Sequence, residues 1–246
     1  MKLFKMIIAL VAIAILATAG AQAGDMGTGM KKSHGMHQGM KMPKNYRMVP
    51  MKQAQILQDG KSKMFCTKCG MTLPMFYRTN HAATVDGKVQ QFCSIYCLVE
   101  AMESGAKVSG VKVVDNSTLK FMDATKAFYA VGSSKPATMA KKVSKYAFGT
   151  KAAAQKFASE FGGTVLGYIE TLAGAKKDFE SDTSAKKMRQ AKGAKKGAMI
   201  YQKKCKTMDQ KFASVAEAKA YIKMHKVCGD IKGKPLQAVG LYLMSR

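Results

Sequence analysis

The stretch AATVDGKVQQFCSIYCLVEAME, from Ala82 to Glu103, holds two strand-like runs, a tight turn and the start of a helix. The turn is Asp86-Gly87, because this dipeptide supplies the positive φ angles that a type I′ hairpin requires. Ser94 predicts the N-cap of the helix, and Gly105 predicts its end. We therefore expect strands at 82–85 and 88–92 and a helix at 95–103.

A soft-ligand motif precedes the hairpin. Cys66 and Cys69 have the spacing at which two thiols can face one point, and Gly70 allows a tight turn directly afterwards. Met71 adds a thioether, and thiolate with thioether is a ligand set that Cu(I) prefers. The alternatives are a Cys66–Cys69 disulfide with Met71 in the core, or thiol–disulfide exchange through the two cysteines.

A second cysteine pair, Cys93 and Cys97, lies at the start of the expected helix. The i, i+4 spacing places both on one face, so they can join the first pair in a four-sulfur site. The two pairs are further apart than in most zinc sites, and disulfides among the four are the alternative. His81, just before the hairpin, is a candidate nitrogen ligand, although a lone His is more often simply hydrogen-bonded.

A second unit follows with a similar order of strands and then a helix, which indicates a structural repeat. Thr150 is the expected N-cap of its helix, and Gly162-Gly163 the expected stop. We expect strands at 108–114, 120–123 and 127–131, a loop at 133–136, a helix at 151–161 and a last strand at 164–170.

The N-terminus has the pattern of a cleaved signal peptide, residues 1–23. A charged start precedes an apolar run from Met6 to Ala17 and a small-residue site ending at Ala23. The run is short for a membrane span, so an uncleaved anchor is the weaker alternative. The sequence therefore predicts export to the periplasm, where cysteines pair, bind metal or take part in redox chemistry.

Residues 24–50 form a Gly-rich segment without apolar periodicity, which predicts a disordered tail. Thioethers suit Cu(I) and imidazoles suit Cu(II), so we interpret the tail as a metal-capturing segment; an incidental low-complexity segment is the alternative. Its candidate ligands are Met26, Met30, His34, Met36, His37, Met40 and Met42.

The C-terminal part is expected to hold a Lys-rich linker with some helical tendency (173–196) and a small helical unit (197–246). Ser214 and Glu217 form a capping box for a helix to about residue 227, and residues 236–244 predict a second helix. Cys205 and Cys228 predict a structural disulfide, with metal binding as the alternative.

Lys and Arg outnumber Asp and Glu by 41 to 15. Export and the lack of a legible nucleic-acid module argue against nucleic acid. The basic excess could instead bind an anionic membrane surface or an acidic partner protein. The simpler interpretation is a basic surface that only contacts solvent. No nucleophile elbow or phosphate-binding Gly loop is present, so we expect no enzyme. Thiol–disulfide exchange is the alternative activity, and a structural zinc module of the four cysteines is the alternative binding role.

The chain resembles the NosL family, accessory proteins of nitrous oxide reductase maturation, over about residues 64–172. The resemblance rests on an ordered series of motifs: Cys69-Gly70-Met71, Gln91-Phe92-Cys93-Ser94, residues 122–133, Met139, Ala147-Phe148, Ala153-Ala154, Phe157-Ala158 and residues 160–163.

This resemblance implies an α+β fold of two small ββαβ-type units packed together (about 64–105 and 106–172) within a copper-binding domain at 51–172. It implies Cu(I) binding by Cys69 and Met71, with Met139 as third ligand. It also implies delivery to the copper-sulfide centre of nitrous oxide reductase, directly or through its membrane maturation complex. Several features depart from the family pattern: the tail and the C-terminal unit are additional, and so are Cys66, Cys93 and Cys97. The lipid-accepting Cys that many family members carry is not found at the predicted cleavage site.

Overall fold

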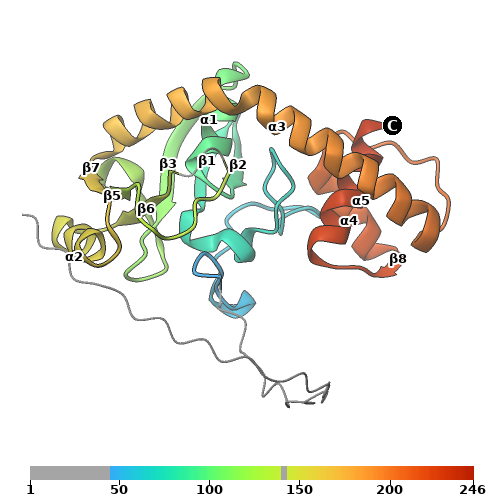
Figure 1. The fold of residues 1–246 in the computed structure, drawn as a ribbon, viewed down its shortest axis with the longest axis horizontal. Coiled ribbons are helices and arrows are strands. Elements are labelled where there is room, and N and C mark those ends of the chain that lie inside the picture. Colours follow the sequence, from blue (N-terminus) through green and yellow to red (C-terminus); the bar gives the residue numbers. More distant parts are fainter. Residues whose placement is uncertain (1–44, 140–142) are drawn as a thin grey trace, which may run out of the picture. The chain divides into compact units, whose positions relative to one another are not determined.

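The structure is a computed structural model that describes residues 45–139 and 143–246. The predicted signal peptide and residues 24–44 of the Met/His-rich segment lie outside these residues, so what we expect of them stays a prediction. Residues 45–50, which we also expected to be disordered, are instead packed on the domain, with Val49 buried and the Tyr46 ring 5.3 Å from that of Tyr146. The described part contains two antiparallel sheets and five α-helices (Figure 1). Three 3-10 helices accompany them: Met51–Gln53, Leu73–Thr79 and Ala124–Lys126.

The first unit consists of a four-stranded sheet and one helix: β1 (His81–Val85), β2 (Lys88–Phe92), α1 (Ile95–Glu103), β3 (Val108–Val114) and β4 (Phe121–Asp123). The strand order is β2-β1-β3-β4, and all neighbours are antiparallel. Asp86 and Gly87 take φ angles of 47° and 79°, so the predicted hairpin turn is confirmed. The helix has the predicted bounds.

The second unit repeats the order strand, strand, helix, strand: β5 (Phe128–Val131), β6 (Lys145–Phe148), α2 (Lys151–Phe161) and β7 (Thr164–Leu166). Its sheet has the order β6-β5-β7. The Thr150 side chain accepts a hydrogen bond from the Ala153 amide, which confirms the predicted N-cap. The α+β fold of two ββαβ-type units is thereby confirmed. Strands β3 and β4, which we expected in the second unit, instead belong to the sheet of the first unit, and β6 is a strand that we did not predict.

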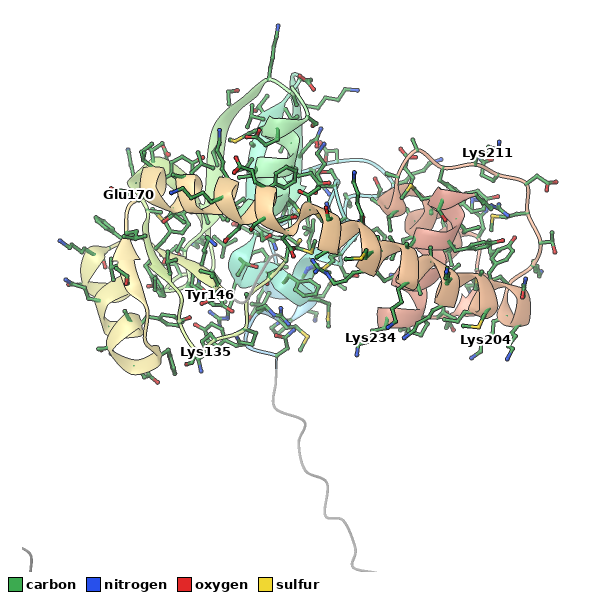
Figure 2. The ribbon with its side chains drawn as sticks, turned by 45° about the horizontal axis from the view of Figure 1, so that its top comes forward. Lys135, Tyr146, Glu170, Lys204, Lys211 and Lys234 are labelled. Atoms are coloured by element: carbon green, nitrogen blue, oxygen red, sulfur yellow. A yellow bond between two sulfur atoms is a disulfide. The ribbon has the colours of Figure 1, made fainter. Side chains whose placement is uncertain are left out.

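Helix α3 (Tyr168–Lys204) differs from the sequence-based expectation. Residues 167–170 were expected in a strand and residues 173–196 in a linker, yet nearly all of them lie within this one helix. Lys and Ala, which dominate the segment, are good helix formers. The helix also packs on α1, where the Phe179 and Tyr96 rings lie 5.4 Å apart. Glu170 and Lys204 are labelled near its two ends in Figure 2.

The C-terminal unit contains α4 (Val215–Met224), β8 (Val227–Asp230) and α5 (Gly233–Ser245). The predicted disulfide between Cys205 and Cys228 is present. Gly197 of α3 lies so close to Ala238 that an added Cβ would meet its carbonyl oxygen at 1.9 Å, so only glycine permits this approach of α3 and α5. Phe65, from outside the unit, belongs to the same apolar core.

Basic side chains lie exposed around this unit, with Lys204, Lys211 and Lys234 labelled in Figure 2. Over residues 45–139 and 143–246, no helix has both the length and the apolar composition needed to cross a bilayer.

Candidate metal centre

The first cysteine pair lies in a tight loop between Phe65 and Thr72, which form an isolated β-bridge. The Cys66 amide donates to the Met71 carbonyl at 2.8 Å, and the Gly70 amide donates to the Cys66 carbonyl at 2.8 Å. Gly70 has a φ of 71°, a value that glycine adopts without strain. These bonds hold the backbone of Cys66 and Cys69 in one turn.

The second pair comes from the junction of the hairpin and α1. Cys93 directly follows β2, and its carbonyl accepts a hydrogen bond from the Thr79 hydroxyl at 2.8 Å. Cys97 lies in the first turn of α1, where its amide donates to the Ser94 carbonyl. The turn between strand and helix therefore presents both thiols to the loop that carries the first pair.

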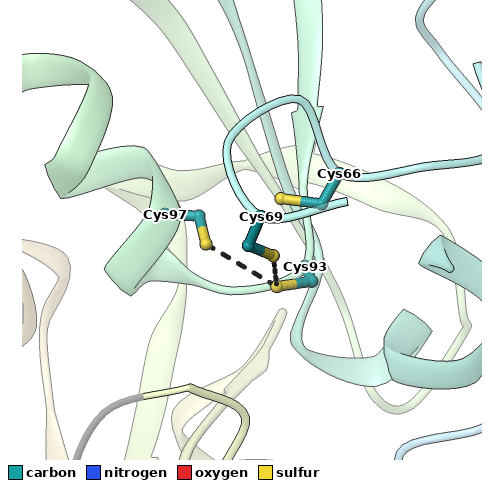
Figure 3. A group of neighbouring side chains, drawn as sticks. All are labelled: Cys66, Cys69, Cys93 and Cys97. Atoms are coloured by element: carbon teal, nitrogen blue, oxygen red, sulfur yellow. Dashed lines mark hydrogen bonds between the residues drawn. The ribbon is translucent and has the colours of Figure 1, made fainter. Parts of the chain in front are cut away.

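The four sulfurs of Cys66, Cys69, Cys93 and Cys97 lie within 4.8 Å of one another (Figure 3). The Cys69 and Cys93 sulfurs are 3.5 Å apart, and those of Cys93 and Cys97 are 3.7 Å apart. All four are buried free thiols, and Cys69 has the largest exposed fraction, 3%. The structure thus joins the two cysteine pairs in one cluster.

The cluster ionises unevenly. Burial favours the neutral thiol of Cys66, yet hydrogen bonds from the other three thiols outweigh it and hold its pKa well below the usual value. Hydrogen bonds with Cys66 and Cys69 raise the pKa of Cys93 and of Cys97 well above that value, and burial adds to the effect. One negative charge is therefore readily accepted in the cluster, and further ones require a cation.

Met71 and Met139 lie beside the cluster. Both are half-buried and pack against the core that contains the cysteines. Together with Cys69 they line a pocket of about 450 Å³, whereas the other three cysteines do not line it. The structure therefore brings Met139 to Cys69 and Met71, which lie about 70 residues earlier in the sequence. The remaining lining residues come from α3 and α5: Lys186, Arg189, Gln190, Gln237 and Leu241.

His81, the candidate nitrogen ligand, lies outside the cluster. Its ring nitrogens are 3.1 Å from the Thr79 carbonyl and 3.2 Å from the Tyr129 hydroxyl, and the side chain is 1% exposed. Burial lowers the pKa of His81 to about 4, so the imidazole is neutral at physiological pH. Its surroundings give it a hydrogen-bonding role in the core.

Two residues of the C-terminal unit touch the cysteine loop. The Lys219 ammonium donates to the Gly70 carbonyl and, at 2.7 Å, to the Gln237 side-chain oxygen. The Gln237 amide donates to the Cys69 carbonyl at 2.8 Å. Burial lowers the pKa of Lys219 to about 8, while the nearby Cys69 and Cys66 thiols act in the opposite direction.

We did not predict these two contacts, which join residues 149 and 168 positions apart. One sequence signal was available for Lys219. It occupies a core position of the i, i+3, i+4, i+7 pattern of α4, in which the other members are Val215, Ala218 and Ile222. A lysine at such a position is rarely buried unless its ammonium group pairs with a polar partner in the interior.

Comparison with known proteins identifies the domain that holds this site. Residues 58–171 match the model of the NosL family. The crystal structure of the copper chaperone NosL from Shewanella denitrificans has 28% sequence identity, and the match covers 49% of this chain and 96% of that one with a TM-score of 0.38. No curated protein matches the sequence. Residues 58–171 of the chain, which contain all four clustered cysteines, Met71 and Met139, are thus similar to the NosL family.

Proposed function

We propose that the protein is a copper chaperone that binds Cu(I) and transfers it to another protein. The observation that carries this proposal is the meeting of Cys69, Met71 and Met139, all within the NosL-like residues 58–171, around one pocket. Thiolate and thioether sulfur are soft ligands that suit Cu(I), whereas zinc rarely uses methionine. The NosL resemblance of the sequence independently implies the same three ligands.

The proposed transfer is a ligand exchange that leaves copper as Cu(I) throughout. The pocket of about 450 Å³ gives a partner's sulfur or nitrogen ligand room to approach a metal held by three side chains. Each new bond to the partner replaces one bond to Met71, Met139 or Cys69, so copper is never released to water. This role needs no catalysis, so we propose no enzymatic activity.

We further propose that transfer takes place in the periplasm and serves the copper-sulfide centre of nitrous oxide reductase. The signal-peptide pattern of residues 1–23 supports export, and the Cys205–Cys228 disulfide suits an oxidising compartment. The receiving partner is then the reductase or its membrane maturation complex. The Met/His-rich tail would capture copper first, and the basic surface would guide docking on acidic protein or anionic lipid.

Mixing protein loaded with one Cu(I) with copper-free nitrous oxide reductase tests this function. We expect copper to move to the reductase after the two are separated by size. The matched control is the chain without residues 24–44, which should deliver copper at the same yield, because the pocket lies in the described domain. Copper that stays with the chaperone, or a yield no better than from a small Cu(I) complex, would contradict the proposal.

A further inference from the structure

The cysteine cluster contains more sulfur than the copper pocket uses. Cys69 lines the pocket, but Cys66, Cys93 and Cys97 do not. We propose that the four thiols form a second metal site, a closed tetrahedral tetrathiolate centre that holds zinc beside the copper pocket. The two sites would share the Cys69 sulfur, since a thiolate has enough lone pairs to bridge two metals.

The geometry of the cluster fits this centre. A tetrahedral site with metal–sulfur bonds of about 2.3 Å has sulfurs about 3.8 Å apart. The distances of 3.5 Å from Cys69 to Cys93 and 3.7 Å from Cys93 to Cys97 lie close to this value. Since all four sulfurs lie within 4.8 Å of one another, small side-chain movements complete the tetrahedron.

Burial separates this site from the copper pocket. Cys66, Cys93 and Cys97 have no exposed surface. Structural zinc sites are closed, with four protein ligands and no open position, whereas a metal that is handed on needs an open side. The cluster thus has the character of a permanent centre, and the pocket with Met71 and Met139 that of an exchange site.

A buried positive charge complements the cluster. Zinc with four thiolates carries a net charge of −2, which must be balanced in a protein interior. Lys219 is 1% exposed, and in the described residues it forms no ion pair with a carboxylate. It donates to the carbonyl of Gly70, the residue after Cys69. An ammonium buried here without a carboxylate indicates an anionic centre close by.

The contacts of Lys219 and Gln237 also order the cysteine loop. They bind the carbonyls of Gly70 and Cys69, and such outer contacts orient the ligands of a metal and typically contribute 10- to 100-fold to its affinity. Both residues lie beyond residues 58–171, the part that matches the NosL family. The C-terminal unit would therefore complete the zinc centre of this chain.

Metal content and cobalt substitution test the proposal on the full chain. Protein purified without added metal should contain about one zinc per chain, and zinc should remain after one equivalent of Cu(I) is added. Replacing zinc with Co(II) should give the intense visible bands of a tetrahedral all-sulfur site, a readout that needs no variant to fold. Absence of zinc, its release by the first Cu(I), or the weak bands of an octahedral site would overturn the proposal.

Three variants separate this site from the copper pocket. Cys97→Ser should lose most of its zinc and keep Cu(I) binding, while Met71→Ala should keep zinc and weaken Cu(I) binding. Lys219→Met should lower zinc affinity about 10- to 100-fold, against no change in the control Lys223→Met, an exposed lysine on the same helix. Equal zinc affinity in Lys219→Met and Lys223→Met would refute the role of Lys219. Zinc loss in Met71→Ala would refute the separate site.

Discussion

Replacing Cys69 with Ser is expected to weaken Cu(I) binding at the pocket more than about 100-fold. Cys69 supplies the one thiolate of the pocket, and a serine hydroxyl is a hard, neutral ligand that Cu(I) disfavours. Removing an outer contact of a metal site already costs 10- to 100-fold, so losing a charged ligand should exceed that range. Competition with a chromophoric Cu(I) chelator measures the change, on chains without residues 24–44 so that the tail does not compete.

Met71→Ala and Met139→Ala should each weaken binding less, by about tenfold, because a thioether carries no charge. The matched control is Met188→Ala, which makes the same change at a methionine of α3 that is 67% exposed and does not line the pocket. It should leave the affinity unchanged. If both Cys69→Ser and Met71→Ala bound Cu(I) with wild-type affinity, the pocket would not be the copper site.

The second large effect is a loss of stability in acid that depends on His81. The folded state holds the pKa of His81 at about 4, against 6.5 for an unperturbed histidine. As the pH falls below 6.5 the unfolded chain takes up a proton that the folded chain refuses until about pH 4. The free energy of unfolding should therefore fall by roughly 3 kcal/mol across this window, at about 1.4 kcal/mol per pH unit.

Urea unfolding at a series of pH values measures this loss in the wild type and in His81→Gln. Glutamine does not titrate, so the variant should show a shallower fall between pH 6.5 and 4, whatever its stability at pH 7. Every other titrating group is common to both proteins, so the difference in slope belongs to His81. Parallel curves would show that its pKa is not lowered.

Features set by neighbouring residues were predictable from sequence. The Asp86-Gly87 turn and the Thr150 cap depend on backbone angles and hydrogen bonds within a few residues. The bounds of α1 likewise followed from Ser94 and Gly105, and the end of α2 from Gly162-Gly163. Strand β6 escaped prediction because four residues carry little periodicity, and its partner β5 is separated from it by a loop.

Helix α3 shows where composition misleads. A Lys-rich stretch with few large apolar residues is typical of a solvated linker. Here a small number of contacts decide the outcome, such as the packing of the Phe179 ring against Tyr96 and the ion pair of Lys186 with Glu100. These partners lie on α1, about 85 residues earlier, and no local pattern announces them.

The candidate site was predictable in part. The spacing of Cys93 and Cys97 indicated a shared face, and the structure places both with the first cysteine pair. Met139 became a candidate through the NosL resemblance alone, because nothing in its own surroundings links it to Cys69. Lys219 and Gln237 were missed since their role depends on how the C-terminal unit docks on the cysteine loop.

X-ray absorption at the copper edge tests the central claim, that Cu(I) binds in the pocket through Cys69, Met71 and Met139. The protein is labelled with selenomethionine and loaded with one Cu(I). We predict sulfur and selenium neighbours at bonding distance, with the selenium signal lost when Met71 and Met139 are both replaced by Ala. A spectrum without selenium, or a selenium signal that persists in the double variant through methionines of the tail, would contradict the account.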